Sequence, residues 1–249
     1  MDPISELMDG ARANALALGR MLVTLSYAQS MDGCLTARRG EGMAISGEET
    51  RLLTHQLRAA NDAILVGIGT VLADDPRLSA RLAGGPHPQP VILDRRLRLP
   101  SEAALLQTKD RMPIVFCGEG VDPDRLHTLE RSGVSIRPVP VRDDGFLDLS
   151  AVLVSLFQSG LLSLMVEGGA RVLSSFLLSG LGDQAMITIA PFWAGGDGRI
   201  EFTGAGNGAY PNLRPNRIER FGRDWVVWGK IGEDCYATSS PVFHSPEPG

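Results

Sequence analysis

The sequence predicts an α/β fold with a mostly parallel central sheet, an antiparallel edge and flanking helices. Short apolar runs alternate along the chain with segments of helical period, which is the pattern of a sheet built from strand–helix–strand units. Two further apolar runs near the C-terminus have no helical segment between them, so they can pair antiparallel at an edge. The composition, 43% hydrophobic and 21% charged over 249 residues, is that of an ordinary globular protein.

The first elements are a helix, a strand and a second helix. Residues 3–18 carry apolar side chains at helical spacing and predict one N-terminal helix. The apolar run 21–27 predicts a strand, and the Met-Asp-Gly sequence at 31–33 predicts a turn after it. Ser46 and Glu49 have the spacing of a capping box, which predicts that Ser46 is the N-cap of the next helix.

The rest of the chain alternates between strands and helices. Pro76 ends a short segment after the strand 63–67, since proline disfavours helix at the residue before it. The Gly-rich stretch 194–208 predicts a long surface loop, and the Pro- and Ser-rich tail from 239 predicts a loose end. The other expected elements are strands at 90–94, 113–117, 134–139, 161–166 and 184–190, helices at 122–132, 148–159 and 170–179, and the late antiparallel strands 225–231 and 235–238.

Charge, cysteine content and hydropathy exclude several classes of protein. A net charge of -5 argues against a generic nucleic-acid binder or a binder of acidic membranes. The three cysteines are widely spaced without a C-x-x-C pair, which fits buried thiols in a reducing compartment. No apolar run is long enough to span a membrane, and no signal-peptide pattern follows the acidic N-terminus. We therefore expect a cytoplasmic protein that binds neither nucleic acid nor membranes.

Several catalytic chemistries lack their motifs in this sequence. The four histidines form no H-E-x-x-H and no other ligand pattern, so no metal is expected. There is no Walker-type phosphate loop, no nucleophile elbow and no zinc-deaminase signature.

The strongest motif runs from Leu164 to Ser175, where an apolar strand enters Gly168-Gly169 and then an amphipathic helix. The glycines let the backbone approach a ligand closely, and a helix N-terminus offers free N–H groups and a partial positive charge to a pyrophosphate. A plain strand–helix connection uses the same pattern, so both interpretations stay open. Glu167 at the strand end is placed either to accept hydrogen bonds from a ligand or to cap the helix.

Two further strand ends lead into charged segments. The first, Gly67–Arg81, passes through a Gly-containing turn with Thr70 and Asp74 before it reaches Arg77 and Arg81. Guanidinium groups hold phosphate by paired hydrogen bonds. The second, Leu93–Arg98, contains three arginines that are suited to the 2′-phosphate of NADPH. Each segment is also consistent with a solvated basic face.

Together these segments resemble the riboflavin-biosynthesis pyrimidine reductase family, the reductase domain of the bifunctional deaminase–reductase. The resemblance covers about residues 20–232, and the motifs follow the family's order at similar spacing. They are Ser30–Gly33, Leu57–Asp62, Val66–Leu78, Val91–Asp94 and Val166–Gly169.

The resemblance implies a dihydrofolate-reductase-like fold, a homodimer and NADPH as cofactor. The family reduces the ribosyl group of a diaminopyrimidine 5′-phosphate, or of its deaminated form, to a ribityl chain. Hydride passes to the sugar C1′ through a ring-opened imine. The reductase domain would span 20–238, between an N-terminal helical extension at 1–19 and a loose C-terminal tail at 239–249. Because no deaminase signature is present, we expect a stand-alone reductase.

The same resemblance implies site residues in this chain. Asp74 and Glu167 are the catalytic candidates, with Asp74 orienting the nicotinamide ribose or assisting proton delivery. Glu167 would also bind the pyrimidine or ribose, and Arg58 and Arg81 the substrate phosphate. Gly42 and Leu78 complete the expected substrate site. The expected cofactor residues are Ala28, Ala44, Thr70, Asp74, Arg95, Gly168, Gly169, Ala170, Arg171, Val172, Leu173, Ser174 and Ser175.

The chain departs from the family pattern at two places. Cys34 stands where many members have Lys or Arg, and Gly40–Ala44 replaces a segment that commonly carries a Ser hydroxyl and a Trp indole. These losses bear on the substrate more than on the cofactor. Two alternatives therefore stay open: an NADPH reductase of the same fold acting on a different carbonyl, imine or pterin-like substrate, and a non-catalytic nucleotide-binding homologue.

Overall fold

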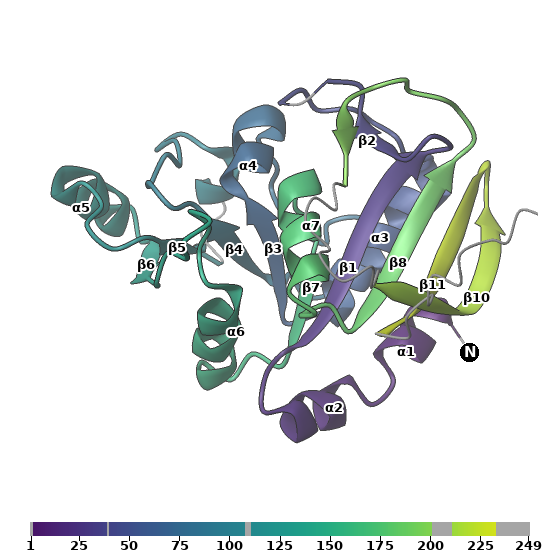
Figure 1. Ribbon diagram of the computed structural model, residues 1–249, viewed down its shortest axis with the longest axis horizontal. Coiled ribbons are helices and arrows are strands. Elements are labelled where there is room, and N and C mark those ends of the chain that lie inside the picture. The colour runs from purple at the N-terminus through teal and green to yellow at the C-terminus, as the bar shows by residue number, and fades with distance from the viewer. Residues whose placement is uncertain (1, 39, 108–110, 201–210, 233–249) are drawn as a thin grey trace, which may run out of the picture.

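The computed structural model describes residues 2–38, 40–107, 111–200 and 211–232. Within these residues one nine-stranded sheet runs through the molecule, in the order β10-β11-β8-β1-β7-β3-β4-β5-β6 (Figure 1). The seven strands from β8 to β6 are mutually parallel, while β11 is antiparallel to both β8 and β10. The strands are β1 (Leu22–Ser30), β3 (Ala63–Gly67), β4 (Gln89–Leu93), β5 (Ile114–Cys117), β6 (Ser135–Pro138), β7 (Ser163–Val166), β8 (Gln184–Ala190), β10 (Asn212–Phe221) and β11 (Asp224–Gly232).

The predicted parallel sheet with an antiparallel edge is thus confirmed. Its central strands are nearly continuous apolar runs, because helices cover both faces of a parallel sheet. Every residue of β5 and of β7 is buried, as are four of the five residues of β3.

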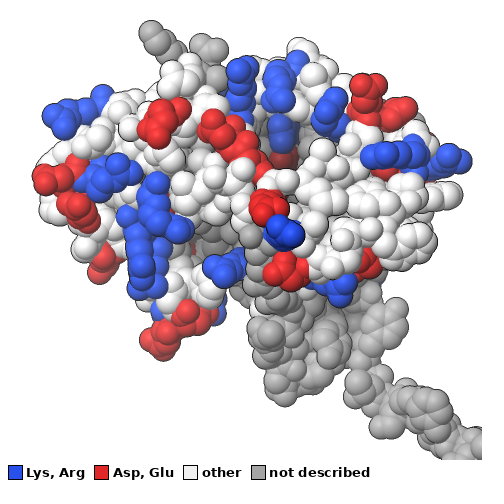
Figure 2. All heavy atoms as spheres, turned by 90° about the horizontal axis from the view of Figure 1, so that it is seen from above, with Lys and Arg blue, Asp and Glu red and all other residues white. Residues whose placement is uncertain are grey.

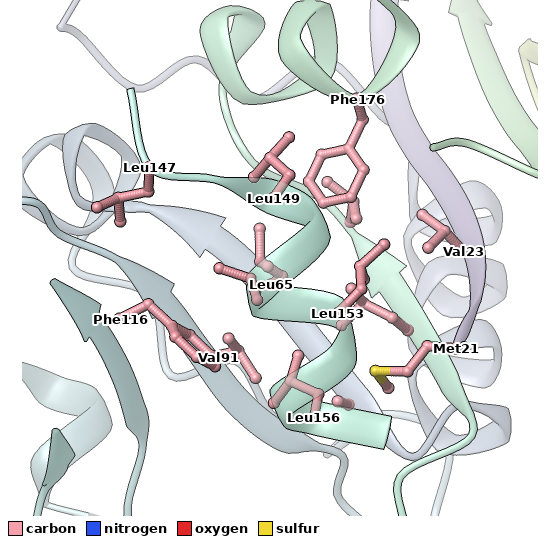
Figure 3. Close-up of a cluster of buried hydrophobic side chains, with 14 of the residues drawn as sticks. Met21, Val23, Leu65, Val91, Phe116, Leu147, Leu149, Leu153, Leu156 and Phe176 are labelled. Carbon is pink, nitrogen blue, oxygen red and sulfur yellow. The ribbon is translucent and has the colours of Figure 1, made fainter. Parts of the chain in front are cut away.

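Helices α6 (Leu149–Gln158) and α7 (Ala170–Leu178) cover one face of the sheet. Figure 3 shows the apolar side chains of α6 pointing toward those of the strands behind them. Phe176 of α7 joins the same cluster, so α7 is held against the centre of the sheet. The buried members labelled in Figure 3 are Met21, Val23, Leu65, Val91, Phe116, Leu147, Leu149, Leu153, Leu156 and Phe176.

Helices α1 (Pro3–Met8), α3 (Glu48–Ala60) and α5 (Pro123–Arg131) pack on the opposite face. Leu53 and Leu57 of α3 contact a cluster that includes Met186 and Trp228 from the sheet. The remaining helices are α2 (Ala11–Leu18), α4 (Ile68–Asp74) and a single 3-10 turn, η1 (Ala104–Leu106). None of the helices in the described ranges is long and apolar enough to cross a membrane.

The single N-terminal helix predicted at 3–18 is wrong, because α1 and α2 are separate helices. Gly10 between them has a φ of 70°, a left-handed conformation that only glycine adopts without strain. The Asp2 side chain caps α1 through a 3.1 Å bond from the Ser5 N–H. Apolar spacing continued across the break, which is why the pattern suggested one helix.

The predicted capping box at Ser46 is also wrong. Helix α3 has Gly47 as its N-cap, without a side-chain capping bond from within the segment. Instead the Asp224 carboxylate of β11 accepts hydrogen bonds from the Gly47 N–H at 2.7 Å and the Thr50 hydroxyl at 2.6 Å. A distant strand therefore supplies the anionic cap that local spacing assigned to Ser46.

The edge hairpin differs from the sequence prediction in its partner. Strand β11 pairs with the preceding β10, whereas a strand at 235–238 was expected to follow it. Residues 235–238 and the tail 239–249 lie outside the described residues. Within the expected 194–208 loop, the short β9 (Gly198–Arg199) pairs with β2 (Cys34–Thr36), and residues 201–210 lie outside the described ranges.

Candidate active site

The carboxyl ends of the parallel strands meet at one edge of the sheet, the upper edge in Figure 1. Ligands of open α/β sheets bind outside these ends. The ends of β1, β7, β3, β4 and β5 are consecutive along this edge. Figure 2 looks onto the edge from above, where basic and acidic side chains surround a hollowed centre. The arrangement suits an extended ligand that lies across several strand ends.

Glu167 and Arg58 form a partly buried charged pair at this edge. Glu167 follows β7 directly, and Arg58 lies in the last turn of α3. The Arg58 Nε and Nη2 each donate to one Glu167 carboxylate oxygen at 2.6 Å, and both side chains are about 15% exposed. Burial alone would lower the pKa of Arg58, but the Glu167 carboxylate raises it above its ordinary value. The planar two-bond geometry fixes the orientation of both groups.

The Gly168-Gly169 turn is joined to the turn after β3. Thr70, in the first turns of α4, accepts a 3.0 Å hydrogen bond from the Gly169 N–H. A Cβ on Gly168 would lie 3.0 Å from the Val172 Cβ and 3.1 Å from the Gly67 N, so a side chain at Gly168 would force its neighbours to shift. Helix α7 begins at Ala170, and its first amides have no acceptors within the helix. The two turns thus form a backbone surface suited to an anionic ligand.

The residues expected to follow this turn lie on α7 in three environments. The side chain of Leu173 is fully buried in the core, so only its backbone could contact a ligand. The hydroxyls of Ser174 and Ser175 donate to carbonyls one turn earlier, at Ala170 and Arg171. Val172 packs against Gly67 and Gly168. The end of α7 nearest the strand ends therefore offers mainly its backbone and the Arg171 side chain.

Gly42 and Asp74 are brought together, although the chain separates them by a strand and two helices. A Cβ added to Gly42 would overlap the Asp74 carboxylate. Asp74 ends α4, and Asp75 after it has a φ of 40°. Asp74 is exposed at the surface, and the part of its carboxylate that is removed from solvent raises its pKa above the ordinary value.

The segment 78–82 runs beside the Arg58–Glu167 pair. Leu78 is buried and has a φ of 50°, and the carbonyl of Ser79 accepts a 3.0 Å bond from Arg58 Nη1. Arg81 is exposed two residues further on. The predicted substrate residues Arg58, Leu78, Arg81 and Glu167 therefore lie in one connected group.

Arg95 lies further along the edge, at the end of β4. It lines a cleft of about 500 Å³ with Arg96, Val141 and the residues 118–122 that connect β5 to α5. Arg95 Nη1 donates to the Gly145 carbonyl at 2.7 Å. Buried Asp94 accepts a 2.8 Å bond from the Leu99 N–H and thereby closes the arginine-bearing turn.

Two other expected positions have simpler surroundings. Ala28 is partly buried on β1 opposite Thr188 of β8, and Ala44 is exposed in the loop before α3.

Cys34, where the chain departs from the family pattern, is buried. Its thiol donates to the Gly196 carbonyl at 3.3 Å and accepts from Arg199 Nε at 3.3 Å. Asp32 accepts from the amides of Ala194 and Gly195, so the Asp-Gly turn holds the 194–199 segment. Cys34 therefore acts in loop packing.

Sequence reasoning missed two parts of this edge. The pairing of Arg58 with Glu167 has no local signal, because the two residues lie far apart in the chain. The cleft segment 118–122 did have one: Gly118 and Gly120 follow β5 and precede a helix, which is the strand–glycine–helix pattern noted at Gly168. Among the described residues there is no cluster of His, Cys, Asp and Glu able to hold a metal ion.

Known proteins resemble this chain in sequence. Residues 21–227 match the family model described as the RibD C-terminal domain. The 2,5-diamino-6-ribosylamino-4(3H)-pyrimidinone 5′-phosphate reductase of Debaryomyces hansenii is 37% identical over 202 residues, covering 76% of this chain and 81% of the relative. The reductase of the same name from Archaeoglobus fulgidus is 33% identical over 222 residues, covering 85% of this chain and 99% of the relative.

Solved structures resemble it in fold. Acinetobacter baumannii RibD superposes with a TM-score of 0.76 at 26% identity, covering 92% of this chain and 62% of that chain. The chain thus spans less than two thirds of that RibD protein. Saccharomyces cerevisiae riboflavin biosynthesis reductase Rib7 gives a TM-score of 0.68 at 25% identity, covering 93% of this chain and 100% of that chain. These likenesses confirm the expected dihydrofolate-reductase-like fold, and with the family match over most of its length the chain belongs to the RibD C-terminal domain family of riboflavin-biosynthesis reductases.

Proposed function

We propose that this chain is an NADPH-dependent reductase that converts the ribosyl group of a (di)aminopyrimidine 5′-phosphate to a ribityl chain, with hydride delivered to the sugar C1′. The proposal rests on one observation: two features suited to cofactor and substrate meet at the same edge of the sheet. The Gly168-Gly169 turn is tied to Thr70, and Glu167 beside it is fixed by Arg58. Relatives that are named as reductases of this kind align with most of this chain.

The cofactor residues we assign extend along consecutive strand ends. The backbone of the Gly168-Gly169 turn and the N–H groups of Ala170 and Arg171 would approach the pyrophosphate, while Thr70 braces the turn by accepting from the Gly169 N–H. Arg95 and Arg96 in the 500 Å³ cleft would take the adenosine 2′-phosphate, which distinguishes NADPH from NADH. NADPH supplies the hydride when bound. The assigned cofactor set is Ala28, Ala44, Thr70, Asp74, Arg95 and Gly168–Ser175.

The substrate residues we assign are Gly42, Arg58, Leu78, Arg81 and Glu167. Glu167 accepts hydrogen bonds from the pyrimidine or ribose, and Arg58 keeps its carboxylate oriented. An arginine carries five N–H donors, of which Arg58 uses three on Glu167 and Ser79. The two others, with exposed Arg81, are available for the substrate phosphate. Asp74, whose carboxylate lies against Gly42 of the proposed substrate site, would assist delivery of the proton that completes the reduction.

The decisive assay follows NADPH oxidation at 340 nm with the diaminopyrimidine ribosyl phosphate and with its deaminated form. Turnover with one of them supports the proposal and identifies the substrate. Glu167→Gln should abolish most of the turnover, while Glu130→Gln on the exposed surface of α5 serves as the matched control. Tight NADPH binding without turnover on either compound would contradict the proposed substrate.

A second candidate function is reduction of a different carbonyl, imine or pterin-like substrate. It is favoured by the surroundings of Cys34 and Ala44. The Cys34 thiol is hydrogen-bonded to Gly196 and Arg199 of a neighbouring loop, and Ala44 exposes only a methyl group. Turnover with the pyrimidine phosphates at a rate typical of enzymes, about 1–1000 per second, would remove this candidate.

We also propose that the protein is a cytoplasmic homodimer with its reductase domain at 20–238. The described helices leave the β8–β11–β10 part of one sheet face uncovered (Figure 1). Ile187, Ile189 and Val227 lie on this face, and register places Trp225 and Ile218 beside them, 47% and 60% exposed. An apolar surface of this kind is typical of an interface. Light scattering on the purified protein tests the dimer, and Trp225→Glu should yield a monomer.

A further inference from the structure

The backbone segment Leu78–Leu82, called here the Arg81 segment, is held by three side chains from outside it. Arg58 Nη1 donates to the Ser79 carbonyl at 3.0 Å. His87 Nδ1 accepts from the Ala80 N–H at 3.3 Å, and His55 Nδ1 accepts from the Leu82 N–H at 3.4 Å. The amides on both sides of the candidate phosphate ligand Arg81 are thus anchored by neighbouring residues.

His55 is buried and lies on the face of α3 that also carries Arg58. His55 is 3% exposed and lies three residues before Arg58, so the two side chains leave the same face of the helix. Since Asp224 caps α3 from β11, the helix that carries both groups is itself fixed to the sheet.

Nδ1 of His55 can accept this bond only while that nitrogen carries no proton. Burial, followed by the charges of Arg58, Arg81, Arg51 and His87, lowers the pKa of His55 to about 4. The neutral ring carries its proton on Nε2 when Nδ1 accepts, and it adds no charge to the surrounding arginines. A lysine or arginine at position 55 would supply no acceptor.

We propose that His55 is a positioning residue that fixes Arg81 for recognition of the substrate's 5′-phosphate. This inference rests on the proposed function, in which Arg81 contacts that phosphate. His55 acts through the backbone of Leu82 and does not contact the substrate. Its loss allows the Arg81 segment to move, which weakens phosphate binding and leaves the hydride step itself intact.

The test compares His55→Leu with His55→Asn. Asparagine places its Oδ1 near the position of Nδ1 and restores an acceptor, whereas leucine preserves bulk without one. We expect His55→Leu to raise the KM for the ribosyl phosphate about tenfold with kcat changed less than threefold, and His55→Asn to recover most of the loss. His127→Leu, at an exposed position on α5, is the matched control and should behave as wild type.

A binding measurement separates this inference from the proposed reaction. Calorimetric titration with ribose 5-phosphate requires no turnover, and both His55→Leu and Arg81→Ala should weaken its binding. If Arg81→Ala leaves ribose 5-phosphate binding unchanged, or the wild type does not bind it, the phosphate assignment of Arg81 is wrong and the role of His55 falls with it. If Arg81→Ala weakens binding and His55→Leu does not, only the role of His55 is wrong.

Two further outcomes bear on the hydrogen bond itself. Equal losses in His55→Asn and His55→Leu would overturn the proposal, because the acceptor would then be irrelevant. His87→Leu releases the same segment at Ala80 from an exposed position, and it decides the question if His55→Leu does not fold. An unchanged KM in His87→Leu would then contradict the anchoring of Arg81.

Discussion

The hydroxyl of Thr70 accepts a 3.0 Å hydrogen bond from the Gly169 N–H and so ties the start of α4 to the start of α7. Thr70→Val keeps the shape of the side chain but removes the acceptor. We expect NADPH binding to weaken about three- to tenfold, because one hydrogen bond contributes about 0.5–1.5 kcal/mol. Thr70→Ser retains the acceptor and should bind NADPH as the wild type does. Fluorescence titration with NADPH measures both variants, and equal affinity in all three proteins would contradict a bracing role for Thr70.

Arg58 depends on Glu167 for its charge partner. Glu167→Gln leaves a guanidinium that is only 14% exposed without its anion. We expect the free energy of unfolding to fall by about 1.5–3 kcal/mol, since hydrogen bonds to charged groups contribute in that range. Urea unfolding measures the change. An unaltered midpoint would show that solvent or Ser79 already satisfies Arg58.

Arg95 tests the choice of cofactor. If it binds the 2′-phosphate, Arg95→Ala should weaken NADPH by about tenfold or more and leave NADH nearly unaffected, as expected for loss of a charge-assisted bond. Arg131→Ala at the exposed end of α5 is the control. Parallel loss of both nucleotides would place Arg95 away from the 2′-phosphate.

Substitutions of Asp224 and of Ser46 should differ in their effect on stability, because only Asp224 caps α3. Asp224→Ala removes the acceptor for the Gly47 amide and the Thr50 hydroxyl, and it should lower stability by about 1–3 kcal/mol. Ser46→Ala should change stability by less than about 0.5 kcal/mol, because Ser46 is not the N-cap. Thermal unfolding of the two variants distinguishes them. A larger loss in Ser46→Ala would restore the local capping box.

His55 makes stability depend on pH in a defined direction. Its pKa is lowered to about 4 in the folded protein from an ordinary value of 6.5, so the unfolded chain takes up more protons between these values. The free energy of unfolding should therefore decrease as the pH falls from 6.5 toward 4. Between pH 7.5 and pH 5, the free energy of unfolding measured in urea should decrease more for wild type than for His55→Asn, which has no titrating group at position 55. Equal losses would contradict a buried neutral histidine.

The sheet and the strand–glycine–helix motif could be predicted because their signals are local. The apolar runs gave parallel strands in the correct places, and Gly168-Gly169 after an apolar strand indicated the turn that opens α7. Strand β10 could not be predicted in the same way. It is an edge strand rich in charged residues, among them Arg217 and Glu219, so it lacks the apolar run on which the other strands were recognised.

The residues of the candidate site could be named from the sequence and its family resemblance, but the bonds that connect them could not. The resemblance implies Arg58, Leu78, Arg81 and Glu167 one by one, whereas the bonds that join Arg58 to Glu167 and to Ser79 cross long stretches of chain. The cap on α3 from Asp224 escaped for the same reason, and Ser46 with Glu49 offered a misleading local alternative. Tertiary contacts of this kind leave no spacing pattern in a single sequence.

The position of β1 in the sheet has a consequence for how the chain reaches its fold. Leu22 lies opposite Ser163 and Thr24 opposite Gln184, so the first long strand finds both of its neighbours only in the second half of the chain. Contacts between residues so distant along the chain form slowly, because a large loop must close before any pairing is gained. On the ribosome β1 must wait, its apolar side chains unpaired, until β7 and β8 have emerged. Refolding from urea should accordingly be slow and prone to aggregation at high protein concentration, since the centre of the sheet depends on contacts between distant parts of the chain.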